Sequence, residues 1–435
     1  MPPGELVRQE RRAQGLTLAQ LGQLTGYSAA QVSRYERSVS PLTDIDVLRR
    51  FAGALSIPPQ WLGLAPAPQT TARHGPCSPY PRLPPPTLAG AHGEDGDVRR
   101  RQFLAATAAA AVGSQAGYRA AEDDARLGEV LVAGLRDAML GLGPASPDSA
   151  PARLSSELAH AHVEFRACAY ASLAVRLPRL IRTAHARADI TGYSVLARCY
   201  LLATRLLIKL DEQQLGWMAA DRARQFSESV GDPLTVAESA RQLAVLARKA
   251  GWHDQALTLA LNAADDPALR EAGTQGAATR GLLIQSAAYT VAWQGDRDGM
   301  RELTAEAAAI ARDLDGTHLH DLGGFSPVTV QLHLVSAENS IGDPSAAIAA
   351  AAAIAPAGLP SAERRARYYT DVANAYNRWG RREDCIHNLL QAERCAPQET
   401  HARPAVKSLV SGLFLSGRTT PELRRLAART GVLNG

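Results

Sequence analysis

The chain has 435 residues and a formal net charge of +4, with 46% hydrophobic and 21% charged residues. This composition excludes a disordered or collagen-like chain, and the length predicts two or three domains. The five cysteines are odd in number and widely spaced, which excludes a disulfide framework and a Cys-x-x-Cys zinc site. Aromatic residues make up only 5% and alanine is frequent, so we expect an all-α protein.

Residues 1–64 read as a bundle of five short helices. Thr17 stands where an N-cap is expected, and Gly26 stands where a tight turn needs a left-handed backbone. Leu24, Ile45 and Trp61 are spaced as core residues of this bundle. Taken together, the stretch from Gly15 to Leu64 resembles the lambda-repressor-like helix-turn-helix of the XRE family of transcription regulators, ending in Glu36-Arg37-Ser38 where that family has Glu-Arg-Gly.

The resemblance implies that the third helix lies in the major groove of an operator. There Arg34 can bond bidentately to guanine, and Gln31 can read adenine. Arg37 and Arg11 are candidates for phosphate contacts, which position the domain without reading sequence. The candidate DNA-binding residues are Ser28, Ala29, Ala30, Gln31, Ser33, Arg34, Arg37, Ser40 and Arg11. This segment holds seven arginines and five acidic residues, a modest excess, so we expect a homodimer to be needed for useful affinity on double-stranded DNA.

Residues 65–97 are rich in proline and later in glycine, without a hydrophobic period, which predicts a disordered linker. The stretch that follows, "RRRQFLAATAAAAVG", resembles a twin-arginine export motif. Its apolar run is short and mostly alanine, and it stands far from the N-terminus, so we favour a helix that begins at Asp97 and opens the second domain. Export stays open as an alternative to a cytoplasmic location.

Residues 98–435 show a helical pattern with a weak repeat. Turn glycines at Gly251, Gly295, Gly342 and Gly380 precede segments of similar pattern. The last unit resembles a tetratricopeptide repeat, although these units are longer than the usual ~34 residues. This domain is therefore expected to be a tetratricopeptide-like α-solenoid that senses a ligand and dimerises.

Stacked helix pairs make a concave surface lined by the first helix of each pair. Arginine and asparagine on these faces suit a peptide with a free carboxylate or acidic side chains. The alternative is an ordinary solvated face. The candidate groove residues are Arg241, Arg248, Gln285, Tyr289, His333, Asn339, Arg367, Asp371, Asn374, Asn377 and Arg378.

The combination of a helix-turn-helix with such an array resembles the peptide-responsive RRNPP regulators. The resemblance implies a DNA-binding regulator that a signalling peptide or small molecule controls. A protein-recruiting adaptor is the alternative. The histidine clusters at residues 160–164 and 318–321 are better read as solvated than as metal ligands, and no P-loop, G-x-G-x-x-G, G-x-S-x-G or H-E-x-x-H pattern occurs. We expect no enzyme activity, no cofactor, no metal and no membrane partner.

Overall fold

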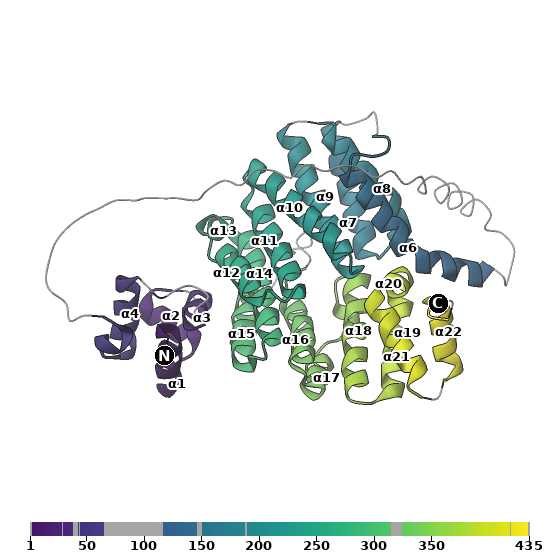
Figure 1. Cartoon of the computed structure of the whole chain (residues 1–435). Helices are drawn as coiled ribbons and strands as arrows, with labels where there is room; N and C mark the ends of the chain where they lie inside the picture. The colour runs from purple at the N-terminus through teal and green to yellow at the C-terminus, as the bar shows by residue number, and fades with distance from the viewer. Residues whose placement is uncertain are drawn as a thin grey trace, which may run out of the picture.

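The computed structural model describes residues 2–27, 29–37, 42, 44–64, 116–145, 150–187, 189–314, 324–417 and 419–433. Within these ranges the chain is all-α, as expected, and contains no strand (Figure 1). None of the described helices combines the length and the apolarity that crossing a bilayer requires. The expected linker at 65–97 and the segment from Arg99 to Gln115, with its twin-arginine motif, lie outside the described residues.

The elements divide into an N-terminal group and a larger C-terminal group. The first is α1 (Pro3–Ala13), α2 (Leu18–Thr25), α3 (Ala29–Glu36), α4 (Ile45–Leu55) and the 3-10 turn η1 (Pro59–Leu62). The second is α6 (Ala116–Met139), α7 (Pro151–Arg166), α8 (Tyr170–His185), α9 (Ile190–Lys209), α10 (Gln213–Val230), α11 (Pro233–Lys249), α12 (His253–Ala264), α13 (Pro267–Glu271), α14 (Gly273–Trp293), α15 (Arg297–Asp313), α16 (Pro327–Ile341), α17 (Pro344–Ala352), η2 (Pro356–Gly358), α18 (Ala362–Arg378), α19 (Arg382–Cys395), α20 (Pro397–Ala402), α21 (Pro404–Leu415) and α22 (Pro421–Arg429).

The N-terminal group forms a small bundle with its own core. Thr17 caps α2 through a capping box with Gln20, and Gly26 ends the helix in the left-handed conformation with φ 76°, as predicted. The core contains Val7, Leu21 and Phe51 among other buried side chains. Four α-helices and one 3-10 turn therefore build the predicted bundle, and the turn stands where a fifth helix was expected.

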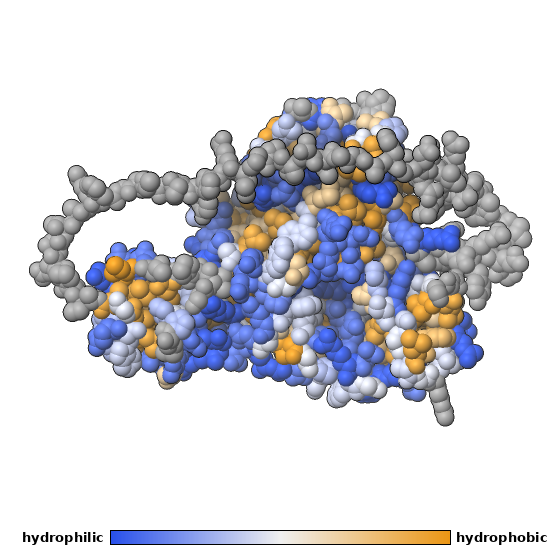
Figure 2. All heavy atoms as spheres, in the orientation of Figure 1, coloured by the Kyte–Doolittle hydropathy of each residue, from blue (hydrophilic) through white to orange (hydrophobic). Residues whose placement is uncertain are grey.

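Three apolar side chains of this bundle do not join its core. Leu24, Ile45 and Trp61 are 60%, 55% and 60% exposed, so the prediction that they face the core was wrong. Each sits at or next to the end of a short element, where the helical period no longer decides which face is covered. Figure 2 shows apolar surface on this part of the molecule.

The C-terminal group is an array of antiparallel helix pairs. In four of the pairs the turn contains the glycine that the repeat pattern marked, Gly251, Gly295, Gly342 or Gly380, with φ of 82°, 76°, 93° and 75°. Asp211 takes the same left-handed position between α9 and α10 with φ 62°. An aspartate tolerates this conformation better than most residues. The turn between α9 and α10 therefore needs no glycine, and for this reason the glycine pattern did not reveal this helix pair.

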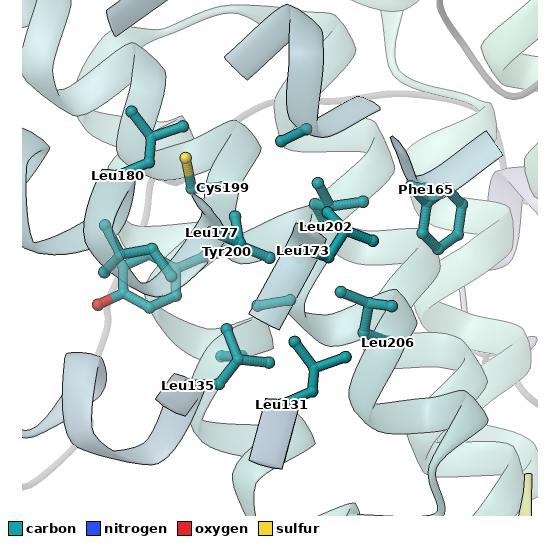
Figure 3. Close-up of a cluster of buried hydrophobic side chains, with 14 of the residues drawn as sticks. Leu131, Leu135, Phe165, Leu173, Leu177, Leu180, Cys199, Tyr200, Leu202 and Leu206 are labelled. Carbon is teal, nitrogen blue, oxygen red and sulfur yellow. The ribbon is translucent and has the colours of Figure 1, made fainter. Parts of the chain in front are cut away.

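The two ends of the array meet. Helices α20 and α22 pack on α6, and α18 packs on α7 (Figure 1). Ala366, Ala396 and Ala402 from the C-terminal end belong to the same buried cluster as residues of α6 to α10. Figure 3 shows the centre of that cluster, where Leu131 and Leu135 of α6 lie with Leu173 and Leu177 of α8. The described array therefore curls until its first and last helices are in contact.

A largely buried lysine links α9 to the C-terminal helices α18 and α20 electrostatically. Lys209 at the end of α9 lies 2.8 Å from an Oε of Glu363 on α18 and 2.5 Å from an Oε of Glu399 on α20. Burial alone would lower the pKa of Lys209, but the two carboxylates hold it above its ordinary value. A charge in this position is tolerated only because its partners are buried with it.

We predict that Lys209→Met destabilises the protein by about 3–5 kcal/mol, because it removes the nearest cation of two buried carboxylates. Among the described residues, only the longer pairs of Glu363 with Arg364 and of Glu399 with Arg403, at 3.5 and 3.4 Å, would remain. Lys249→Met is the matched control, since Lys249 pairs with the exposed Asp211 and should cost under about 1 kcal/mol. The measurement is the free energy of unfolding in denaturant. Equal losses for the two variants would show that Lys209 does not hold the ends together.

Candidate nucleic-acid interface and central chamber

Helix α3 is held on the N-terminal bundle by an unusually close approach of α1. A Cβ atom built on Gly4 would lie 2.0 Å from the backbone oxygen of Tyr35, so only glycine fits there. On its other side, α3 packs Val32 into the core, while the rings of Tyr27, Tyr35 and Phe51 form a cluster with centroids 5.4–5.9 Å apart. These contacts fix the direction of α3 relative to α2.

An internal ion pair fixes the end of α3. Nε of Arg11 donates to Oε1 of Glu36 at 2.6 Å, and Nη2 donates to Oε2 at 3.0 Å, with both side chains buried. Arg11 also donates to the backbone oxygen of Leu16 at 2.7 Å. Sequence reasoning assigned Arg11 to a phosphate, but the structure places it as a brace between α1 and α3 in this arrangement. The sequence alone did not show that the carboxylate of Glu36 is buried and therefore needs Arg11 as its cation.

The other candidate DNA-binding residues are distributed around α3. Ala29 and Gln31 are half-buried, and Ser33 is buried. Ser28, Ser40 and the side chain of Ala30 lie outside the described residues. Arg34 and Arg37 point away from the bundle core, as their expected role requires, and both reach carboxylates of the helix array.

Those carboxylates form an acidic patch, which we define as Asp265, Asp296, Asp298 and Glu302 at the end of α12 and the start of α15. Nη2 of Arg34 lies 3.2 Å from Oδ2 of Asp265, and Nη2 of Arg37 lies 3.1 Å from Oδ2 of Asp296. Burial lowers the pKa of both arginines, although the neighbouring carboxylates oppose this. No sequence signal predicts the contact, because Asp296 looks like an ordinary helix N-cap and Asp265 is simply the polar residue that follows α12.

The array surrounds a central chamber of about 570 Å³. It is lined mainly by α7, α9, α11, α14, α16 and α18, the first helix of successive pairs, as the groove prediction requires. Nine lining side chains are cationic and two are carboxylates. The cations are Arg166, Arg205, Lys209, Arg241, Arg248, Lys249, Arg364, Arg367 and Arg403, and the carboxylates are Glu363 and Asp371.

Most of these cations have carboxylate partners. Arg205 and Arg241 both pair with Glu238, at 2.5 and 2.7 Å. Burial would raise the pKa of Glu238, but the two arginines hold it well below its ordinary range. The chamber wall is thus a set of charge-assisted pairs rather than a layer of free cations.

In the part of the chain that the structure describes, Arg248 combines burial with the lack of a carboxylate partner. It is 6% exposed, and no carboxylate in the described residues pairs with it. Its Nη1 donates to the backbone oxygen of Ser286 and to Oγ1 of Thr290, both at 3.2 Å, and its guanidinium lies 4.4 Å from the ring centroid of Tyr289. Burial lowers the pKa of Arg248. This cation faces the chamber with its charge uncompensated.

The structure brings six of the predicted groove residues to the chamber: Arg241, Arg248, Tyr289, His333, Arg367 and Asp371. Asn374, Asn377 and Arg378, from the second half of α18, do not line it, and Arg378 donates instead to the backbone oxygen of Asn339. Asn339 is buried and donates to the backbone oxygen of Asp371 at 2.8 Å. Gln285 is buried and does not line the chamber, and within the part of the chain that the structure describes neither atom of its amide has a hydrogen-bond partner.

His333 completes the lining. Burial, together with Arg367 and Arg364, lowers its pKa well below the ordinary value, so the imidazole is neutral near pH 7. Within the described residues no group of three His, Cys, Asp or Glu side chains could hold a metal ion. The second histidine cluster of the sequence, His318, His320 and Asp321, lies outside the described residues.

Comparison with known proteins identifies the N-terminal bundle. Residues 4–60 match the family model described as a helix-turn-helix domain. The chain matches no curated protein. With α2, the turn at Gly26 and α3 arranged as described, the bundle is an XRE-like helix-turn-helix domain, which supports a DNA-binding transcription regulator.

We predict that Gly4→Ala loosens α3, because the new methyl group cannot fit against Tyr35 without moving α1. The expected cost is about 1–3 kcal/mol. Gly53→Ala is the control, since a Cβ there meets open space in the last turn of α4 and should stabilise that helix by up to about 0.5–1 kcal/mol. Hydrogen exchange of the α3 amides measures the effect, and equal protection in both variants would contradict it.

Proposed function

We propose that this protein is a sequence-specific transcription regulator whose helix array binds a small anionic ligand that modulates operator binding. The helix-turn-helix match carries the DNA-binding part of the proposal. The cationic chamber with the buried, uncompensated Arg248 carries the ligand part. On this reading the domains are residues 1–64 for DNA, residues 65–97 as the connection and residues 98–435 for sensing.

For DNA recognition we propose that α3 enters the major groove and that Arg34 reads guanine while Arg37 contacts phosphate. Both guanidinium groups already point away from the bundle core toward anions, which is the geometry that a groove requires. Gln31 remains the candidate for adenine. A DNA-binding function also implies a cytoplasmic protein with access to the chromosome.

A homodimer is part of the proposal. The N-terminal bundle has only a small excess of positive charge, and phosphate neutralisation supplies most of the affinity of a single module for DNA. Two bundles on one operator would therefore be needed. A mapped operator with two half-sites about one helical turn apart would support the dimer, and a single half-site would count against it.

For the ligand, the chemistry of the chamber favours an anion. Arg248, Arg367 and Tyr289 lie in its wall, and guanidinium groups bind carboxylate or phosphate through two parallel hydrogen bonds. The volume of about 570 Å³ falls within the ~300–1,000 Å³ of small-molecule sites. Because the ends of the array meet, a small molecule or the end of a peptide fits better than a long extended peptide. Control by a ligand through a tetratricopeptide-like array would be the logic of RRNPP regulators.

We predict that Arg34→Ala relaxes specificity at one base pair by about 1–3 kcal/mol. Operators are first recovered by genome-wide mapping of bound DNA, and affinities are then compared for the operator and its single-base variants. The ratio of the affinities for the operator and for a variant site does not depend on how often Arg34 leaves Asp265, because that step changes both affinities by the same factor. Arg49→Ala is the control, since Arg49 is exposed on α4. Unchanged specificity in Arg34→Ala would remove its assignment, and recovery of a stable protein partner without DNA would favour the adaptor.

We predict that an anion in the chamber stabilises the protein. Citrate, succinate, inorganic phosphate and the dipeptide Glu-Glu are suitable probes, and a ligand at 100 times its Kd adds about 2.7 kcal/mol. Arg248→Met should abolish the rise in Tm for the best probe, whereas Arg224→Met, on the exposed face of α10, should preserve it. A rise that is equal in both variants would place the anion outside the chamber.

A further inference from the structure

The face of α3 that is proposed to read DNA is covered in this structure. Helix α3 packs against both α12 and α15 of the array. The side chains of Arg34 and Arg37 are only 7% and 13% exposed, although they point away from the core of their own bundle. Their burial comes from the array, because the carboxylates that they meet belong to it.

The contact is built from matched charges. Four arginines of the N-terminal bundle face the acidic patch: Arg34 pairs with Asp265, Arg8 and Arg37 share Asp296, and Arg12 pairs with Asp298. The distances between nitrogen and oxygen are 3.1–3.3 Å. In addition, Nη1 of Arg11 lies 3.6 Å from an Oε of Glu302. The patch thus offers carboxylates where DNA would offer phosphates.

The shape of the array fits the contact as well. A Cβ atom on Gly299, in the first turn of α15, would lie 2.1 Å from Nη2 of Arg37. The absence of a side chain at this position therefore allows Arg37 to reach Asp296, which also caps α15 by accepting from the backbone nitrogen of Gly299 at 3.0 Å. Charge and close approach coincide at one point of the interface.

We propose that the acidic patch is a docking surface for the DNA-reading face of the chain's own helix-turn-helix, and that this closed arrangement excludes operator DNA. Arg34 cannot lie in a major groove while it is buried against Asp265, so docking and DNA binding compete for the same guanidinium groups. The proposal rests on the proposed DNA-binding function and adds to it the regulation of that same site.

The closed arrangement is suited to opening. Nε of Arg34 and Nη1 of Arg37 are buried and find no hydrogen-bond partner among the described residues. Such a group costs free energy that contact with DNA or water would recover. The apparent affinity for DNA is the intrinsic affinity multiplied by the open fraction, so a weaker contact means tighter DNA binding.

The test uses the full chain with Asp265→Asn and Asp296→Asn together. Asparagine keeps the cap of α15, because it serves as an N-cap as well as aspartate does, but it removes both charges. The control carries Asp221→Asn and Glu228→Gln on the exposed face of α10, which change the net charge equally outside the contact. The probe is a labelled duplex that carries a site recovered from genomic DNA by this protein.

We expect the patch variant to bind the duplex at least about fivefold more tightly than the control variant, with faster hydrogen exchange at Arg34 to Arg37 in the absence of DNA. Exchange that is unchanged would overturn the docking contact. Faster exchange with equal affinity in the two variants would overturn the competition with DNA. If neither the original protein nor any variant bound DNA, both the proposed function and this inference would fail. If the original protein bound DNA and the two variants bound it equally tightly, this inference alone would be overturned.

Discussion

Pairing of arginine with carboxylate is the interaction on which this structure depends. Lysine occurs only at Lys209, Lys249 and Lys407, so 44 of the 47 basic residues are arginine. The planar guanidinium makes directed bonds to carboxylates even when it is buried. Such pairs fix α3 within its bundle, join the bundle to the array and build the wall of the chamber. Each also costs desolvation, so removing one partner is more damaging than losing the bond alone.

The chamber and the acidic patch share structural elements. Helix α14 lines the chamber with Tyr289 and Trp293, and the turn that follows it carries Asp296. Helix α11 lines the chamber with Arg248 and packs on α12, whose end carries Asp265. A ligand that shifts α11 or α14 would therefore act directly on the residues that hold the DNA-reading face. Coupling between the two sites requires that a ligand bind two arrangements of the array with unequal affinity, and the shared helices α11 and α14 could differ between those arrangements.

Sequence reasoning predicted the features that depend on local chemistry. The cap at Thr17 and the left-handed turns at Gly26 and Gly251 follow from side-chain and backbone preferences, and the structure confirms them. Features set by contacts between distant residues were out of its reach. The period of a helix does not show that the array closes on itself, that Leu24 is exposed, or that Asp265 meets Arg34. For the chamber, the helix faces predicted six of the residues that line it, whereas the cations of α7 and α9 and Arg403, which follows α20, could be found only from the closed array.

Hydrogen exchange of the full chain with and without operator DNA tests the central claim most directly. The account predicts that DNA keeps α3 protected while the end of α12 and the start of α15 become less protected, because the acidic patch loses its partner. It also predicts that a random-sequence duplex at the same concentration has a smaller effect. Protection of α3 by operator DNA with no change at α12 and α15 would contradict the account, since it would mean that the bundle binds DNA without leaving the array.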